Sequence, residues 1–158
     1  MTYAPELHEQ ILAEEAELRV ASFGKEDAWR LGCQMRAAAA ERGLPVAVGI
    51  MLGGQRVFHA ALEGSSADND GWLARKTAVV LRYGRSSLGV GEQFRVRGRD
   101  FDRDSRLDPG QYAAHGRVFP LVLVGGALLG AVGVSGLPER EDHDFVVEQL
   151  RGFLAARG

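Results

Sequence analysis

The sequence predicts a single α+β domain in which helices cover an antiparallel sheet of about five strands. Two pairs of short apolar segments are each joined by two glycines, a pattern typical of β-hairpins. Segments with apolar residues at helical spacing stand before, between and after these pairs. The 158 residues suit one domain and show no linker, so we expect it to span residues 1–158.

The chain is expected to open with a helix and a short strand. Residues Pro5–Leu18 are amphipathic and acidic, which indicates the helix. The stretch LRVASF, from Leu18 to Phe23, alternates in polarity and predicts the fifth strand. A long helix follows and ends at Gly43, which precedes Leu-Pro. Its apolar residues recur at a spacing of three or four and are Ala28, Leu31, Met35 and Ala38.

The remaining four strands are predicted as two hairpins. LPVAVGIML and QRVFHAAL flank Gly53-Gly54, which supplies the positive φ angles of a tight turn. The longest apolar run, Val118–Val134, is divided by Gly125-Gly126. We therefore interpret this run as a buried hairpin and not as a membrane span.

A further helix is predicted between the hairpins, and another after them. The first begins near SADNDGW and ends at Gly84; the residues suited to its N-cap are Ser66, Asp68, Asn69 and Asp70. The second begins at Pro138, because proline fits the first helical position. Acidic residues follow this proline, where the helix dipole favours negative charge.

Composition excludes several classes of function. The single cysteine, Cys33, excludes an internal disulfide, a thiolate zinc cluster and covalent haem attachment, and we expect it to be inert. The acidic N-terminus lacks a secretory or transit signal, so a cytoplasmic location is expected. A net charge of -2 gives no global attraction to nucleic acid or to anionic membranes, and neither is expected as a partner.

The most highly charged stretch is RVRGRDFDRDSRLD, from Arg95 to Asp108. It contains five arginines and four aspartates, so its charges largely cancel. We interpret it as a solvated or interface loop with local ion pairs. A phosphate-binding loop is the alternative.

His143 is the first candidate functional residue. It stands three residues before Val146 and seven before Leu150, so it belongs to the buried stripe of the last helix and is expected to face inward. Ser135 lies in the turn before this helix, whose free N–H groups suit an anion. The two residues are therefore predicted to form the polar end of a ligand pocket. The alternative is that His143 hydrogen-bonds to a backbone or carboxylate group at the edge of the core.

The stretch DNDGWLARK is the second candidate. Lys76 shares a helical stripe with Trp72, and Arg75 stands beside it, so a cation approaches an apolar face. These cations are predicted to anchor carboxylates of a ligand, with Trp72 available for stacking. The alternatives are a lysine whose ammonium reaches solvent and a tryptophan that packs in the core. Among the other histidines, His59 alternates with apolar residues and lines either a core or an interface.

Two stretches resemble the haem-degrading-domain family, the GlcG/HbpS-like proteins: DNDGWLARKTAVVLRYGRSS and GGALLGAVGVSGLPEREDHDFVVEQL. The motifs W-x-x-R-K and G-V-S-G-L-P-x-x-E-D-H carry the resemblance, which extends from about Leu18 to Leu154. The likeness is greatest to a branch of that family that is found in bacteria and fungi. It implies a profilin-like fold and a homo-oligomer built from dimers.

Some members of that family bind haem, so the resemblance implies haem as a candidate cofactor. Haem degradation requires an axial ligand, a pocket that activates oxygen and a route for electrons. Of these the sequence offers only a candidate ligand, His143, or less favourably His59.

Three hypotheses follow. The first is a cytoplasmic homo-oligomer that binds a small anionic or tetrapyrrole-like ligand beside the start of the last helix. The second is an enzyme that uses His143 as a general acid or base. The third is a non-catalytic assembly or adaptor protein.

Overall fold

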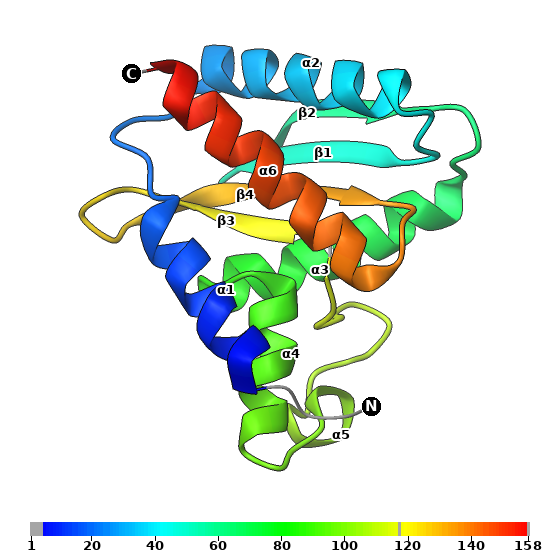
Figure 1. Cartoon of the computed structure of the whole chain (residues 1–158). Coiled ribbons are helices and arrows are strands. Elements are labelled where there is room, and N and C mark those ends of the chain that lie inside the picture. The colour runs from blue at the N-terminus through cyan, green and yellow to red at the C-terminus, as the bar shows by residue number, and fades with distance from the viewer. Residues whose placement is uncertain (1–4, 117, 158) are drawn as a thin grey trace.

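The computed structural model describes residues 5–116 and 118–157 and confirms the α+β architecture (Figure 1). The helices are α1 (Pro5–Glu17), α2 (Lys25–Glu41), α3 (Ala67–Tyr83), α4 (Ser87–Val96), α5 (Phe101–Asp104) and α6 (Glu139–Arg157). The strands are β1 (Ala47–Leu52), β2 (Gln55–Ala61), β3 (Val118–Val122) and β4 (Leu128–Ser135).

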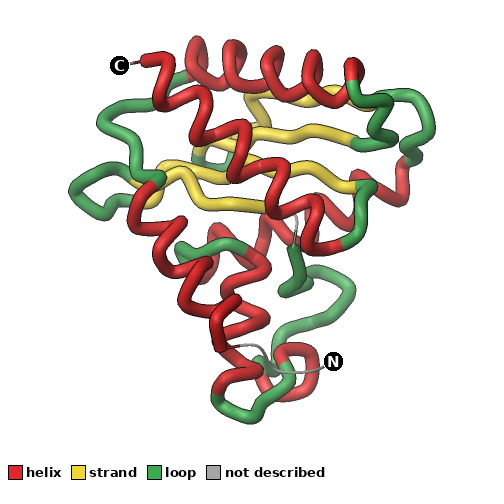
Figure 2. Tube along the Cα trace, in the orientation of Figure 1, coloured by secondary structure: helices red, strands yellow, loops and turns green. Residues whose placement is uncertain are grey.

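The four strands form one antiparallel sheet in the order β2-β1-β4-β3. Helices α2 and α6 cover one face and α3 covers the other, while α1, α4 and α5 gather beyond the β3 edge (Figures 1 and 2). The main core lies under α2 and α6, where Val48, Ile50, Val132 and Val134 are fully buried. The alternate residues of these strands face α3, because successive side chains of a strand point to opposite faces.

The predicted fifth strand is wrong. In the segment Leu18–Phe23, Val20 alone pairs, through an isolated parallel bridge to Leu123. The N–H of Leu18 still donates to Glu14 at the end of α1, and Gly24 already caps α2. Both ends of the connection thus belong to helix termini, and its described residues form this one bridge and no strand. The profilin-like description of the fold stays a prediction.

Both predicted hairpins are confirmed, and so is the role of their glycines. β1 pairs with β2 and β3 with β4 in antiparallel register. Gly53 has a φ of 56° and Gly126 a φ of 101°, values that a residue with a side chain adopts only with strain.

The sequence prediction missed α4 and α5. Ser86 caps α4 by accepting a hydrogen bond from the N–H of Gly89, and Asp100 caps α5 in the same way. The arginine-rich stretch therefore begins inside α4 and is partly helical. Its expected local ion pairs are present, for example between Arg103 and Asp104 at 3.1 Å. Glycines and Ser87 occupy several buried positions of α4, so the apolar period that would reveal a helix is weak.

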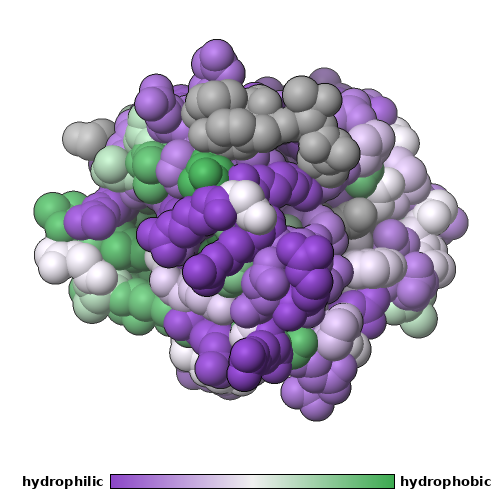
Figure 3. Space-filling view, turned by 90° about the horizontal axis from the view of Figure 1, so that it is seen from below, coloured by the Kyte–Doolittle hydropathy of each residue, from purple (hydrophilic) through white to green (hydrophobic). Residues whose placement is uncertain are grey.

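Polar side chains cover the centre of the face seen from below in Figure 3, and hydrophobic residues gather at one edge of that view. Exposed large hydrophobic side chains of the described residues are Leu12, Trp29, Trp72, Val124 and Leu128. Within the described residues, no helix has the length and the hydrophobicity that crossing a membrane requires.

Candidate functional site

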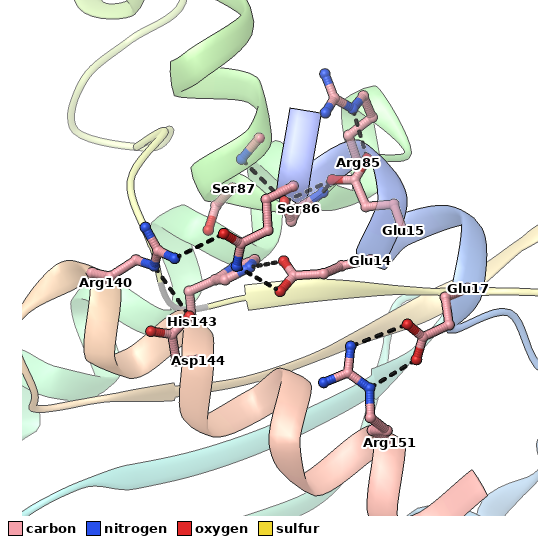
Figure 4. A network of polar contacts seen from close by, with 12 residues as sticks. Glu14, Glu15, Glu17, Arg85, Ser86, Ser87, Arg140, His143, Asp144 and Arg151 are labelled. Carbon is pink, nitrogen blue, oxygen red and sulfur yellow. Dashed lines mark hydrogen bonds and ion pairs between the residues drawn. The ribbon is translucent and has the colours of Figure 1, made fainter. Parts of the chain in front are cut away.

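His143 lies at the centre of a polar network beneath α1 (Figure 4). Its side chain is 1% exposed, and its Nε2 lies 2.8 Å from Oε1 of Glu14. The amide of Gln10 donates to the other oxygen of Glu14 at 3.2 Å. The inward orientation agrees with the sequence expectation, and the contact is the carboxylate hydrogen bond that the alternative interpretation anticipated.

The second ring nitrogen of His143 is also buried. Nδ1 has no hydrogen-bond partner among the described residues, and the ring packs 6.0 Å from that of Phe119. Neither nitrogen therefore reaches solvent in this conformation. A ligand or substrate could touch the imidazole only after α1 had moved.

The charge on Glu14 results from two opposing effects. Burial raises the pKa of its carboxyl group, while the hydrogen bonds with His143 and Gln10 lower it, and the balance places the pKa below its ordinary value. Arg140 adds a smaller effect in the same direction. Glu14 is therefore a buried carboxylate that the imidazole holds in place.

Further polar contacts join α1 to α6 and to the start of α4. Glu17 receives two hydrogen bonds from Arg151, at 2.8 and 3.1 Å. Glu15 receives one from Arg85 at 2.8 Å and one from the hydroxyl of Ser86 at 2.7 Å (Figure 4). Three acids of α1, Glu14, Glu15 and Glu17, are thus each bonded to α6 or to the residues just before α4.

A groove of about 540 Å³ runs between α1 and α6. Its described lining includes two arginines, Arg140 and Arg151, but also three carboxylates, Glu14, Asp144 and Glu148. Both arginines are already paired, Arg140 with Asp144 and Arg151 with Glu17. This balance of charge gives an anionic ligand no advantage here.

The structure does not bring Ser135 and His143 together. Val134 packs in the core beneath α6, so the alternation of the strand directs the buried Ser135 toward α3. His143 belongs to α6, on the opposite face of the sheet. The sequence argument placed both residues near one turn but could not assign them to faces.

Trp72, Arg75 and Lys76, by contrast, form one cluster on α3. The guanidinium of Arg75 lies 4.1 Å from the Trp72 ring centroid, and the ammonium of Lys76 lies 5.2 Å from it. Both distances are within the range of cation–π attraction. Lys76 is 1% exposed, so its ammonium does not extend into solvent, whereas Trp72 is 37% exposed. Lys76 and Ser135 face the same side of the sheet.

A cavity of about 200 Å³ lies between α3 and the strands β1 and β2, and we call it the α3 groove. Its described lining is Gly49, Ile50, Met51, Arg56, Leu73, Ala74, Thr77, Ala78 and Leu81. Arg56 is the one charged side chain among them. The absence of a side chain at Gly49 lets Leu73 approach β1 closely, because a Cβ at that position would lie 2.9 Å from Leu73.

An imidazole–carboxylate pair stands beside the α3 groove. Nε2 of His59 lies 2.7 Å from Oδ1 of Asp70, and both side chains are about one-third exposed. His59 is the cross-strand neighbour of Gly49, which lines the groove, and directly opposed side chains of two strands lie on one face. The sequence analysis noted His59 but had no means to pair it with Asp70, because the register of β1 and β2 and the placement of α3 decide that contact.

Comparison with known proteins identifies the family. A model described as haem degrading protein HbpS-like matches residues 23–151. The chain belongs to this HbpS-like family. The match confirms the resemblance seen in the sequence.

Relatives of this HbpS-like chain occur in several bacteria. A UPF0303 protein of Streptomyces coelicolor is 49% identical, over 98% of this chain and 99% of its own length. A UPF0303 protein of Edwardsiella ictaluri is 41% identical, over 92% of each chain.

Solved structures share the fold. The Ybr137w protein superposes with a TM-score of 0.84 at 30% identity, over 92% of this chain and 87% of its own. A PduOC–haem complex superposes with a TM-score of 0.67 at 18% identity, over 84% and 94% of the two chains. HbpS itself gives 0.64 at 17%, over 88% and 92%. At such low identity the last two show a common fold and nothing more.

Proposed function

We propose that this HbpS-like protein binds a small ligand with an apolar body and an anionic group in the α3 groove. The composition of the groove carries the proposal, since its described lining is mostly apolar and includes a single cation, the exposed Arg56. An apolar body would displace water from Leu73 and Met51, while a carboxylate would pair with the guanidinium. Few, well-placed polar groups in an apolar cleft are the usual composition of a ligand site.

Haem is the ligand that the family description favours, and one protein of the same fold was solved as a haem complex. Bound haem would supply a redox-active iron. His143 does not fit the role of axial ligand, because both of its ring nitrogens are buried. His59 is the other candidate, because it is about one-third exposed beside the groove and would bind iron through Nε2 once that atom left Asp70.

The size of the α3 groove bears on how haem would bind. At about 200 Å³ the groove is smaller than the 300–1,000 Å³ typical of ligand pockets, so it would accept only part of a tetrapyrrole. We propose that Arg56 would pair with a propionate and that His59 would hold the iron. A second position for binding the carboxylates of a ligand remains part of the proposal, on the other flank of α3. Its residues are those that the sequence predicted: Trp72, Arg75, Lys76 and Ser135.

A haem titration tests the axial ligand. We expect His59→Ala to shift the Soret band and to weaken haem binding by about tenfold or more. Loss of a group that only orients a metal ligand already costs about tenfold, and loss of the ligand itself should cost at least as much. His115→Ala is the matched control, because His115 is also partly exposed and its Nδ1 lies 3.7 Å from Oε1 of an acid, Glu139. Unchanged spectra in His59→Ala, or an equal change in the control, would contradict the assignment. A shift confined to His143→Ala would return the role to His143.

Benzoate, which has an aromatic ring and a carboxylate, tests the α3 groove without haem. Calorimetry is expected to detect benzoate binding that Arg56→Gln weakens and that Arg75→Gln leaves unchanged. The opposite ranking of the two variants would move the ligand to the Trp72 cluster.

We further propose that the protein is a cytoplasmic homo-oligomer built from dimers. The family resemblance is the basis of this proposal, and exposed apolar side chains such as Trp29 and Val124 are surface that a second copy would cover. Light scattering is expected to give a multiple of the 17.1 kDa chain. A mass of one chain would contradict the oligomer, and a discrete multimer that binds neither haem nor benzoate would favour the assembly or adaptor hypothesis.

A further inference from the structure

A third pocket lies at the end of α4, apart from the α3 groove and from the groove between α1 and α6. It has a volume of about 210 Å³, and its described lining is Tyr83, Gln93, Phe94, Arg97 and Arg99. Two aromatic rings, two guanidiniums and one amide therefore meet in one small space. No acidic side chain is among these described lining residues.

The backbone fixes the positions of both arginines. The N–H groups of Arg97 and Arg99 donate to the same carbonyl, that of Phe94, at 3.1 and 2.8 Å. Gly98 between them has a φ of 68°, which lets the chain turn back after the helix ends. The two side chains consequently start from neighbouring points at the pocket.

The aromatic part of the pocket is also held in place. The ring of Phe94 meets that of Phe101 edge-to-face, with centroids 5.2 Å apart, and Tyr83 meets the same ring at 6.1 Å. Phe101 is 7% exposed and belongs to the small core between α3, α4 and α5. The rings that line the pocket therefore rest on a packed support.

The charges of Arg97 and Arg99 distinguish them from other arginines of the same stretch. Arg95 pairs with Glu92, and Arg103 pairs with Asp104. Within residues 5–116 and 118–157, neither Arg97 nor Arg99 has an acidic partner within 4 Å. Asp104 is paired with Arg103 and interacts with Arg99 only through longer-range charge, so an anion in the pocket would be attracted by both guanidiniums.

We propose that this pocket binds a small aromatic phosphate monoester. The phosphate oxygens accept hydrogen bonds from Arg97 and Arg99, because the planar guanidinium matches phosphate geometry. The ring of the ligand packs against Phe94 and Tyr83. A cavity of about 150 Å³ holds one benzene molecule, so 210 Å³ suits one ring with one phosphate group. The site is independent of the α3 groove and gives the arginine-rich stretch a phosphate-binding role.

Calorimetry with phenyl phosphate tests the site on the whole protein. We expect wild type to bind phenyl phosphate, and the double variant Arg97→Gln/Arg99→Gln to lose at least about tenfold in affinity, since both charge-assisted contacts are removed. Arg103→Gln is the matched control, because it removes an exposed charge from the same stretch but does not line the pocket. Its affinity is expected to stay within about twofold of wild type.

Two comparisons decide the result. Inorganic phosphate is expected to bind more weakly than phenyl phosphate, because it makes no contact with the rings. Equal affinities, no binding by wild type, or an equal loss in Arg103→Gln would each overturn the proposal. All titrations are repeated in an Arg56→Gln background, which removes the cation of the α3 groove and leaves this pocket as the measured site. Thermal unfolding of each variant verifies that the fold is intact.

Discussion

Replacing Glu14 by alanine is expected to lower the free energy of unfolding by about 3 kcal/mol. An unsatisfied buried polar group costs about 1–3 kcal/mol and a broken buried ion pair about 3–5 kcal/mol, so we take the value that the two ranges share. The substitution would leave Nε2 of His143 without its 2.8 Å partner in a place that water does not reach, and Nδ1 already lacks one among the described residues. Urea unfolding followed by circular dichroism measures the loss.

Glu17→Ala is the control for this prediction. Glu17 stands on the same helix and also bonds to α6, but it and Arg151 are each about half exposed. Exposed pairs of this kind contribute about 0–1 kcal/mol. A loss for Glu14→Ala no larger than that for Glu17→Ala would show that burial of the His143 contact does not matter.

The difference in stability between wild type and Glu14→Ala is also expected to depend on pH. The pKa of Glu14 lies below its ordinary value of 4.5, because the hydrogen bonds with His143 and Gln10 outweigh the effect of burial. A carboxyl group with a lowered pKa stabilises the fold above the pKa of the unfolded chain, and this contribution is lost as the pH falls through the folded value. The difference between wild type and Glu14→Ala is therefore expected to be full near neutral pH and to shrink below about pH 4.5. A difference that grows on acidification would contradict this assignment.

Replacing Gly91 by alanine is expected to destabilise the protein by about 1–3 kcal/mol, although alanine is the better helix former. A Cβ on Gly91 would overlap the backbone carbonyl oxygen of Ala114, and neither α4 nor the loop before β3 can move without disturbing its packing. The position is buried, so the new methyl group has no exit to solvent. Urea unfolding again gives the change.

Gly152→Ala supplies the matched control in α6. No atom beyond its own helix and chain neighbours lies within 4 Å of a Cβ at that exposed position. The helix should gain stability there by about 0.5–1 kcal/mol, because glycine has the larger backbone entropy when unfolded. If Gly91→Ala stabilised the protein as Gly152→Ala does, the close approach of α4 to Ala114 would be incorrect.

The elements that the sequence predicted correctly are those with a strong local signal. The hairpin glycines, the cap at Ser66 and the apolar period of α2 depend on neighbours a few residues away. The segment Leu18–Phe23 had strand-like alternation, but a strand also requires a partner along its length, and that partner is not a local property. Helix α4 was missed because its glycines weaken the local signal. Distant packing explains them: Gly91 lies against Ala114 and Gly89 against Glu15 of α1.

The candidate site divides in the same way. The helical period of α6 was enough to predict that His143 faces inward, and the spacing of Trp72, Arg75 and Lys76 was enough to place them on one side of α3. Whether an inward side chain meets a ligand or a partner depends on what packs over it.

The sequence by itself determined the α+β class, the two hairpins, the family and the buried position of His143. Only the tertiary structure decided that Glu14, 129 positions away, satisfies that histidine, and that Ser135 faces the other side of the sheet. It also decided that Asp70 orients His59 beside an apolar groove. The physical reason is that local periodicity fixes the direction of a side chain, whereas its partner depends on how distant elements pack against one another.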